Sequence, residues 1–208
     1  MNYKALIAAA LAATTVAIVQ ASTVDEAVPK PWFKNGQAPA SNVCRAGVDT
    51  GVEQAGTPNL TLKCDTNENG FVGVMQMFSA KDYIGKRVRF SALAKAEGIE
   101  GWGGLWMRID QGAQMLAFDN MQNRPIKGSL DWTSESVVLD VPKATPAASD
   151  GTPGTAPTGV FFGILMNGRG QLWISNVQFE VVGSDVPTTT SLPDNPIPSG
   201  PGNLSLSR

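Results

Sequence analysis

Short segments of alternating hydrophobic and polar residues fill the chain from residue 43 to residue 182, and they constrain its fold more than any other feature. Gly, Asn, Asp and Pro separate these segments at regular intervals, and helix-forming patterns are nearly missing. Such short, regularly spaced strands are typical of an all-β sandwich. The expected strands cover residues 43–49, 59–65, 71–79, 87–96, 102–110, 114–121, 132–141, 159–166 and 171–182.

The first 21 residues have the features of a secretory signal peptide. The stretch MNYKALIAAALAATTVAIVQAS carries a lysine at position 4, then an apolar run, then the small residues that signal peptidases favour. We expect cleavage after Ala21 and a periplasmic or secreted protein; a retained signal anchor is the alternative. No apolar run of about 18 residues follows, so we expect no membrane span after signal removal.

Composition places the boundaries of the sandwich domain at residues 43 and 183. A polar, Pro-containing lead-in covers 22–42, and we expect a loose segment that can dock Trp32 and Phe33. Residues 142–158 hold four prolines and no large apolar side chain, which predicts a long mobile loop. The Pro-, Ser- and Thr-rich tail, 184–208, has too little apolar surface to bury, so we expect it to be disordered.

The two cysteines predict a disulfide, because an exported chain is oxidised outside the cytoplasm. A hairpin in which Cys44 faces Cys64 places three pairs of residues on one apolar face, and a slip of one residue would destroy this arrangement. The pairs are Cys44–Cys64, Ala46–Leu62 and Val48–Leu60. Two buried free thiols are the alternative.

Charge and histidine content exclude several functional classes. The formal net charge is −2 and no run of Lys or Arg occurs, so no electrostatic footprint for nucleic acid is present. Histidine is absent, which excludes Ser-His-Asp and Cys-His catalysis and every His-ligated metal site.

The order of the motifs resembles a known family. The segments GVDTGVEQAGTPNLTLKCD, FVGVMQMFSAKDYIGKRVRFSALAKAE, LDWTSESVVLDVP and GQLWISNVQFEVV are similar to those of jelly-roll carbohydrate-binding modules of the galactose-binding-like superfamily. This resemblance implies a jelly-roll β-sandwich of two antiparallel sheets, with a glycan site on the concave face. Asn176 stands where the family's closing strand has a carboxylate, which departs from the family's calcium site. The middle of the chain, GLWMRID and LAFDNMQNRPIKG, also resembles an uncharacterised bacterial domain appended to some AraC-type regulators.

Strand 102–110 suggests where a ligand would bind. Its apolar parity, with Leu105 and Ile109, should face the core, so Trp106, Arg108 and Asp110 should face outward. An exposed tryptophan can stack on a sugar ring while polar neighbours bind its hydroxyls. The expected ligand-binding residues are Gln76, Trp106, Arg108, Asp119, Asn120 and Arg124. The alternative is that Trp106 and Arg108 only stack on each other as a surface cation–π pair.

We therefore expect an exported bacterial domain that binds a glycan or a similar polar small ligand. One alternative is a small histidine-free enzyme, a carboxylate-driven lyase, hydrolase or cyclase, that uses Asp110, Asp119 and Arg108. An envelope scaffold is a further alternative. No cofactor is expected, although the oxygen-rich loop at residues 65–69 could hold a structural calcium ion or be a solvated turn. The sequence indicates neither the ligand's identity nor the oligomeric state.

Overall fold

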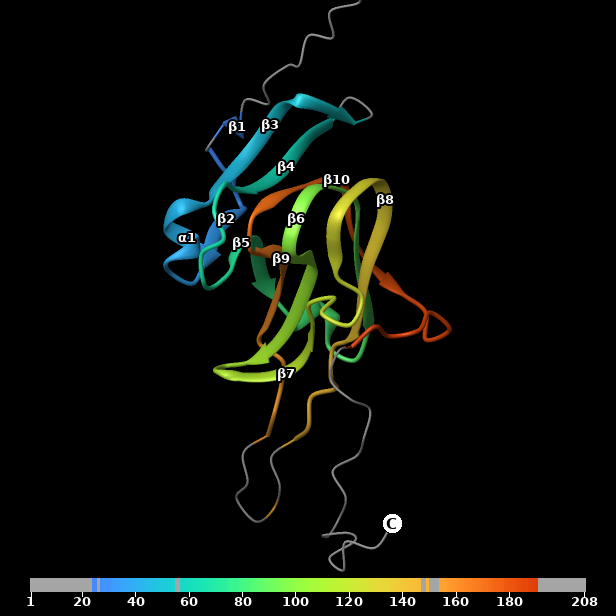
Figure 1. Cartoon of the computed structure of the whole chain (residues 1–208). Coiled ribbons are helices and arrows are strands. Elements are labelled where there is room, and N and C mark those ends of the chain that lie inside the picture. The colour runs from blue at the N-terminus through green and yellow to red at the C-terminus, as the bar shows by residue number, and fades with distance from the viewer. Residues whose placement is uncertain (1–23, 26, 55–56, 147–148, 150–153, 191–208) are drawn as a thin grey trace, which may run out of the picture.

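The computed structural model describes residues 24–25, 27–54, 57–146, 149 and 154–190. It confirms the expected all-β fold, a jelly-roll β-sandwich of antiparallel strands (Figure 1). The elements are β1 (Val24–Asp25), β2 (Phe33–Gly36), α1 (Ala40–Val43), β3 (Arg45–Gln54), β4 (Thr57–Cys64), β5 (Val72–Ser79), η1 (Lys81–Tyr83), β6 (Arg87–Gln111), β7 (Gln114–Asp119), β8 (Ile126–Asp140), β9 (Gly159–Asn167) and β10 (Gly170–Val182).

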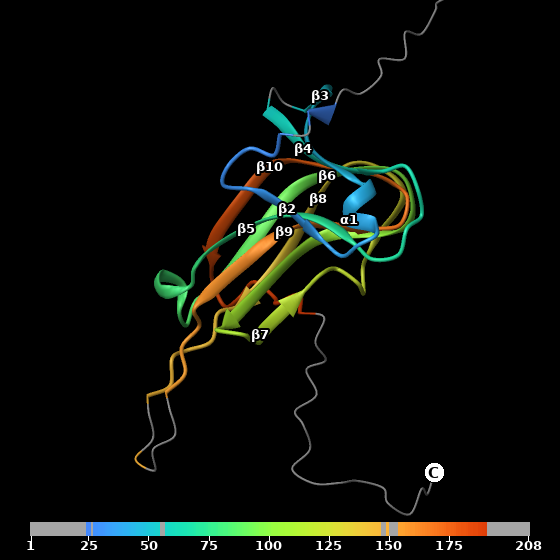
Figure 2. The same cartoon turned by 90° about the vertical axis from the view of Figure 1, so that its left-hand side faces the viewer.

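Strand β6 belongs to both layers of the sandwich. Its first part, residues 87–97, pairs with β10 and with β8, and its second part, residues 102–110, pairs with β9 and with β7. One layer therefore has the order β1-β3-β4-β10-β6-β8, and the other has the order β2-β5-β9-β6-β7. Figure 2 shows β5, β9, β6 and β10 running in similar directions across the molecule.

The expectation of two separate strands, 87–96 and 102–110, is wrong. The glycines between them resemble a turn in the sequence, but they allow a single strand to bend. Gly98 has a φ of 58°, and the backbone of Gly101 lies so close to the carbonyl oxygen of Asn167 that no side chain would fit. Glycine tolerates both conditions at low steric cost.

The core lies between the two layers, and the predicted inward parity of β6 is confirmed. Leu105, Met107 and Ile109 are fully buried in the main hydrophobic cluster together with side chains from the opposite layer, among them Phe90 and Leu172. Alternation along a strand thus correctly assigned these residues to the core.

The β3–β4 hairpin has the predicted register. Ala46 pairs with Leu62 and Val48 pairs with Leu60, and the Cys44–Cys64 disulfide is formed. The apolar pattern and the cysteine positions therefore both indicated the correct pairing.

The lead-in is part of the fold and not a loose segment. Strand β2 pairs with β5 over four residues, and the ring of Trp32 makes an edge-to-face contact with Phe162 at 5.4 Å between centroids. The ordered domain therefore begins before residue 43. A four-residue strand is too short to show a convincing alternation, which is why the sequence pattern missed it.

The chain also remains attached to the sandwich after residue 183. Residues 183–190, here called the C-terminal strap, turn back toward β8 after β10 (red in Figure 1). The backbone N–H of Thr189 donates to the carbonyl of Val138 at 2.9 Å, and the N–H of Val138 donates to Thr189 Oγ1 at 2.8 Å. The boundary expected at 183 was therefore too early.

Several expectations fall on residues outside this description. The signal peptide (residues 1–21), most of the tail (191–208) and part of the loop 142–158 are among them. Within that loop, the structure shows an isolated antiparallel bridge between Thr145 and Thr155. Among the described residues, no helix is long and apolar enough to cross a membrane.

Candidate functional site

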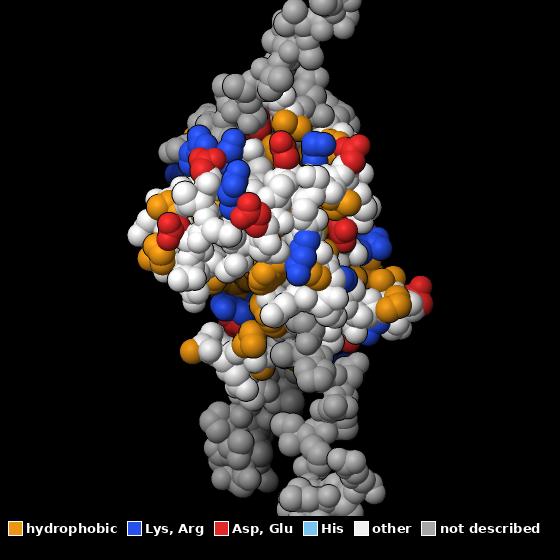
Figure 3. All heavy atoms as spheres, viewed as in Figure 1, with side chains coloured by type: hydrophobic (Ala, Val, Ile, Leu, Met, Phe, Trp, Pro, Cys, Tyr) orange, Lys and Arg blue, Asp and Glu red, His pale blue; other side chains and the backbone are white. Residues whose placement is uncertain are grey.

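The outward side of the β2-β5-β9-β6-β7 layer carries a second hydrophobic cluster. We call this surface the aromatic face. Its cluster consists of Phe71, Met75, Trp102, Trp106, Phe118, Phe161 and Leu165. Figure 3 shows hydrophobic side chains gathered across the middle of the view, over β6 and β7. Phe33 and Met77 extend the apolar surface and are exposed.

Trp106 faces outward as predicted but is not exposed. Only 7% of its surface is accessible, because its neighbours on the same face pack around it. Gly163 lies opposite both Met75 and Trp106 in the sheet and has no side chain, so these two large residues can meet across β9. The expectation of an open stacking platform at Trp106 is therefore wrong. The rings around Trp106, those of Phe71, Trp102, Phe118 and Phe161, are partly buried and remain partly accessible to solvent.

Unpartnered polar atoms are concentrated on this face. Among the described residues, five buried side-chain N or O atoms have no hydrogen-bond partner. Four of them belong to outward-facing residues of this one layer: Asn35 Oδ1, Trp106 Nε1, Arg108 Nε and Asp110 Oδ1. Buried polar atoms in native proteins are nearly always hydrogen-bonded, so such a group calls for an explanation such as a bound ligand.

Asn35 was not identified by the sequence reasoning. It pairs with Gly73, which alternates with the core residues Val72 and Val74 and therefore faces outward. The outward apolar residues of β9, Phe161 and Leu165, were also missed. The sequence GVFFGILMN could have indicated them, because its apolar residues occupy both parities and do not alternate with polar ones.

Arg108 is held in place by two contacts on the face. Its Nη2 lies 2.8 Å from Asp110 Oδ2, and its Cζ lies 4.9 Å from the centroid of the Phe161 ring. Such a cation–π contact contributes about 0.5–1 kcal/mol. These contacts leave Nε as a fixed donor without a protein partner.

Asp110 is buried at the end of the same strand. Its side chain is 8% exposed, and Arg108 contacts only one of its two carboxylate oxygens. The backbone carbonyl of Asp110 accepts hydrogen bonds from Thr158 N at 2.7 Å and Thr158 Oγ1 at 3.2 Å, which fixes the strand end. The free oxygen, Oδ1, is therefore a positioned acceptor.

Asp119 and Arg124 form a structural pair away from the aromatic face. Asp119 pairs with the core residue Met107, so its buried carboxylate points to the inner side of the sheet. Arg124 donates to both carboxylate oxygens, at 2.6 and 3.2 Å, and also to the carbonyls of Ser136 and Thr189. The pair therefore ties β7, β8 and the C-terminal strap together.

The other two expected ligand residues are not brought to the face either. Gln76 pairs with the core residue Phe162, so it has the inward parity of β5. Asn120 accepts a hydrogen bond from the backbone N–H of Gln122 at 3.1 Å in the turn after β7. Of the six predicted ligand residues, the structure thus unites Trp106 and Arg108.

The carboxylates needed for the enzyme alternative lie on opposite sides of the sheet. Asp110 faces outward, whereas Asp119 faces inward and is paired with Arg124. In the part of the chain that the structure describes, no group of three or more Cys, Asp or Glu side chains is placed to hold a metal ion. Asp65, from the oxygen-rich loop, forms an ion pair with Arg45 at 2.9 Å.

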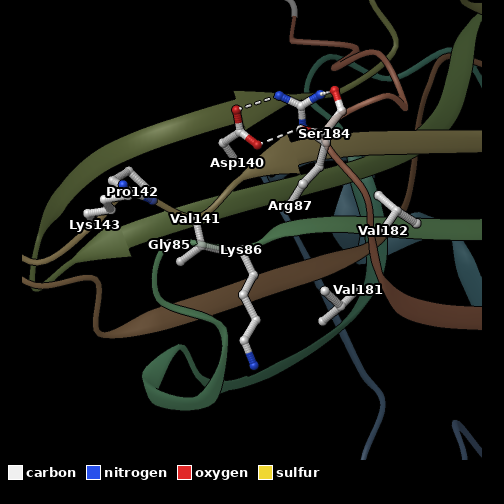
Figure 4. Close-up of a pocket in the computed structure, with 10 residues that line it drawn as sticks. All are labelled: Gly85, Lys86, Arg87, Asp140, Val141, Pro142, Lys143, Val181, Val182 and Ser184. Carbon is white, nitrogen blue, oxygen red and sulfur yellow. Dashed lines mark hydrogen bonds and ion pairs between the residues drawn. The ribbon is translucent and has the colours of Figure 1, made fainter.

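A separate hollow of about 490 Å³ lies where β6 begins and β8 and β10 end (Figure 4). Arg87 occupies it with hydrogen bonds to Asp140 at 2.7 and 2.9 Å and to the carbonyl of Ser184 at 2.9 Å. Figure 4 shows that Lys86 points away from this ion pair. The charged groups here are used to hold the C-terminal strap, which makes this hollow a weaker candidate than the aromatic face.

Comparison with known sequences relates this chain to a transcriptional regulator. No model of a known protein family matches the chain. The chain is 36% identical over 181 residues to an uncharacterised HTH-type transcriptional regulator, YbfP, of Bacillus subtilis (strain 168). That alignment covers 85% of this chain and 56% of the regulator, so the chain spans little more than half of its relative. This similarity fits the resemblance to a regulator-appended domain.

Solved structures similar to this chain include the enzymatically active domain of tailspike protein 4 of bacteriophage CBA120. It has a TM-score of 0.52 and 13% identity, and the match covers 74% of this chain and 20% of that one. A CBM22-1 xylan-binding domain of Paenibacillus barcinonensis Xyn10C has a TM-score of 0.47 and 12% identity, covering 78% of this chain and 93% of that domain. At such identities, the tailspike match concerns the fold alone.

Proposed function

We propose that the aromatic face binds a glycan or a similar polar small ligand. The observation that carries this proposal is the row of buried, unpartnered atoms on Trp106, Arg108 and Asp110 beside partly accessible rings. A buried polar atom without a partner costs free energy, and a ligand hydroxyl removes that cost once the side chains around the atom shift to admit it. The rings of Trp102, Phe118 and Phe161 would meanwhile contact the apolar C–H faces of the ligand.

Binding is favoured over acid–base catalysis by the placement of the carboxylates. General acid–base hydrolysis by two carboxyl groups needs one group on each side of the bond that is cleaved. Asp110 and Asp119 are separated by the sheet itself, whereas the donors and acceptors of the aromatic face all lie on one side.

A matched pair of tryptophan variants tests the proposal. Calorimetric titration would use neutral oligosaccharides of glucose, galactose, mannose and xylose against the wild-type protein, Trp106→Phe and Trp173→Phe. Trp106→Phe keeps an aromatic ring and removes the unpartnered N–H, so affinity should fall about tenfold, the value of one hydrogen bond. Trp173 Nε1 donates to Asp49 at 2.8 Å in the other layer, so Trp173→Phe should leave affinity unchanged.

Two results would contradict this function. One is that no member of the panel binds the wild-type protein. The other is that Trp106→Phe and Trp173→Phe bind as tightly as each other.

Export is part of the same proposal. It is supported by the signal-like sequence of residues 1–21 and by the buried Cys44–Cys64 disulfide, a bond typical of oxidising compartments. N-terminal sequencing of protein recovered from outside the cytoplasm should begin at Ser22. An intact Met1 in that fraction would contradict removal of the signal.

A further inference from the structure

We propose that Asp110 selects the ligand by charge, so that the aromatic face takes neutral sugars and rejects sugars that carry a carboxylate. This inference rests on the proposed function, because it specifies the class of ligand for the same face.

The aromatic face has a balanced charge. Among the described outward residues of β5, β6, β7 and β9 near Trp106, one positive side chain, Arg108, lies beside one negative side chain, Asp110. The two are joined at 2.8 Å, so each charge already has its counter-ion. A ligand therefore gains nothing by bringing a net charge to this face.

The unpartnered atoms also specify what the ligand must offer. Arg108 Nε and Trp106 Nε1 are donors, and they need an acceptor. Asp110 Oδ1 is an acceptor, and it needs a donor. A hydroxyl group accepts and donates at once, so a neutral sugar satisfies both kinds of atom.

A carboxylate satisfies only half of this set. It could accept from Arg108 Nε, but it has no proton to donate to Asp110 Oδ1, and the two negative charges would repel each other in a poorly hydrated site. Position reinforces this effect, because Asp110 lies two residues beyond Arg108 on the same face of β6 and is fixed by Thr158. The negative charge of Asp110 therefore disfavours binding of an acidic ligand to the guanidinium of Arg108.

Replacing Asp110 should reverse the selection. In Asp110→Asn the side chain keeps its size, the repulsion disappears, and Arg108 loses its counter-ion and becomes free to bind an anion. Arg108→Gln has the opposite consequence, since Asp110 then remains charged without a cation. These two variants therefore move the preference in opposite directions.

The experiment compares matched sugars that differ in one group. The probes are neutral oligomers of glucose, galactose and mannose and the corresponding oligomers of glucuronic, galacturonic and mannuronic acid, titrated into wild type, Asp110→Asn and Arg108→Gln. Asp65→Asn is the matched control, because Asp65 also pairs with an arginine, Arg45, but lies at the end of β4 in the other layer. Circular dichroism of each variant would check that it is folded.

The wild-type protein and Asp65→Asn should bind the neutral member of a pair at least tenfold more tightly. Asp110→Asn should weaken neutral binding and strengthen uronate binding until the gap closes or reverses, while Arg108→Gln should widen the gap. Wild-type preference for the uronate, or an unchanged ratio in Asp110→Asn and Arg108→Gln, would overturn the charge selection and leave glycan binding standing. Absence of binding to both members of every pair would overturn the proposed function itself.

Discussion

Trp106 shows that a strand residue can face away from the core and still be buried. Alternation along β6 assigned its direction correctly, because the residues between its outward neighbours are core residues. Exposure depends on what the neighbouring strands place on the same face, here Met75 of β5, Leu165 and Phe161 of β9 and Phe118 of β7. A single strand's pattern does not contain that information.

The burial of Trp106 has a measurable energetic consequence. Trp106→Ala should lower the free energy of unfolding by about 3–5 kcal/mol, as truncation of a buried aromatic side chain does. Met77 lies on the same face but is 60% exposed, so Met77→Ala should change stability by no more than about 0.5 kcal/mol. Urea unfolding of both variants is the measurement, and similar values for the two would contradict the burial of Trp106.

The elements differ in how far the sequence predicted them. The β3–β4 hairpin was predicted in its register because two cysteines and four apolar residues indicated the same pairing. Strand β2 was missed because four residues are too few to show alternation. The C-terminal strap was missed because it is held by β8, Arg87 and Arg124, all of them distant in the sequence. The same difference holds for the site. Trp106 and Arg108 were predicted because they lie on one strand, whereas identifying Asn35 required the order of the strands in the sheet.

The disulfide should stabilise the β3–β4 hairpin. Cys44 and Cys64 are 20 residues apart, and closing such a loop contributes about 3 kcal/mol in the chain-entropy estimate. Thiol titration of the denatured, unreduced protein should detect no free thiol, and Cys44→Ala with Cys64→Ala should unfold at lower urea concentration. Two reactive thiols in the unreduced protein would contradict the bond.

The C-terminal strap should be needed for full stability. Ending the chain after Gly183 removes the hydrogen bonds of Thr189 to Val138 and deprives Arg124 of one acceptor, so stability should fall by about 2 kcal/mol. A chain that ends after Thr190 keeps these contacts and is the control. Identical melting temperatures for the two truncations would show that the strap contributes nothing.

The ion pair that holds the strap also predicts a pH dependence. Hydrogen bonds from Arg87 lower the pKa of Asp140 below its usual range, with burial opposing the shift. A carboxyl group with a lowered pKa stabilises the folded protein above its unfolded pKa, and the contribution is lost as the pH falls through the folded pKa. Asp140→Asn should therefore reduce the melting temperature near neutral pH and have little effect near about pH 2.

The expected effect of Asp140→Asn is small. The Asp140 side chain is 58% exposed, and a solvent-exposed ion pair contributes no more than about 1 kcal/mol. Thermal unfolding at both pH values checks the prediction, and an equal loss at both would show that ionisation of Asp140 is not the cause.

At the scale of the whole molecule, the structure separates support from binding. Two ion pairs, Arg124 with Asp119 and Arg87 with Asp140, hold β7, β8 and the strap together. The aromatic face, on the outward side of the β2-β5-β9-β6-β7 layer, carries four of the five buried polar side-chain atoms that have no protein partner among the described residues. The alternating segments indicated the class of fold, while this division of roles became visible only with the strands in place.

Strand β6 makes the two layers of the sandwich inseparable. Because the same 25 residues form part of both layers, a cut within β6 would leave each fragment with an incomplete sheet, and neither layer can be exchanged as a module. The connection between β8 and β9 offers a better place to open the chain, since the exposed bridge between Thr145 and Thr155 lies outside the strands of both layers. Anyone who wishes to split this protein into complementing halves, or to insert a reporter, should begin there.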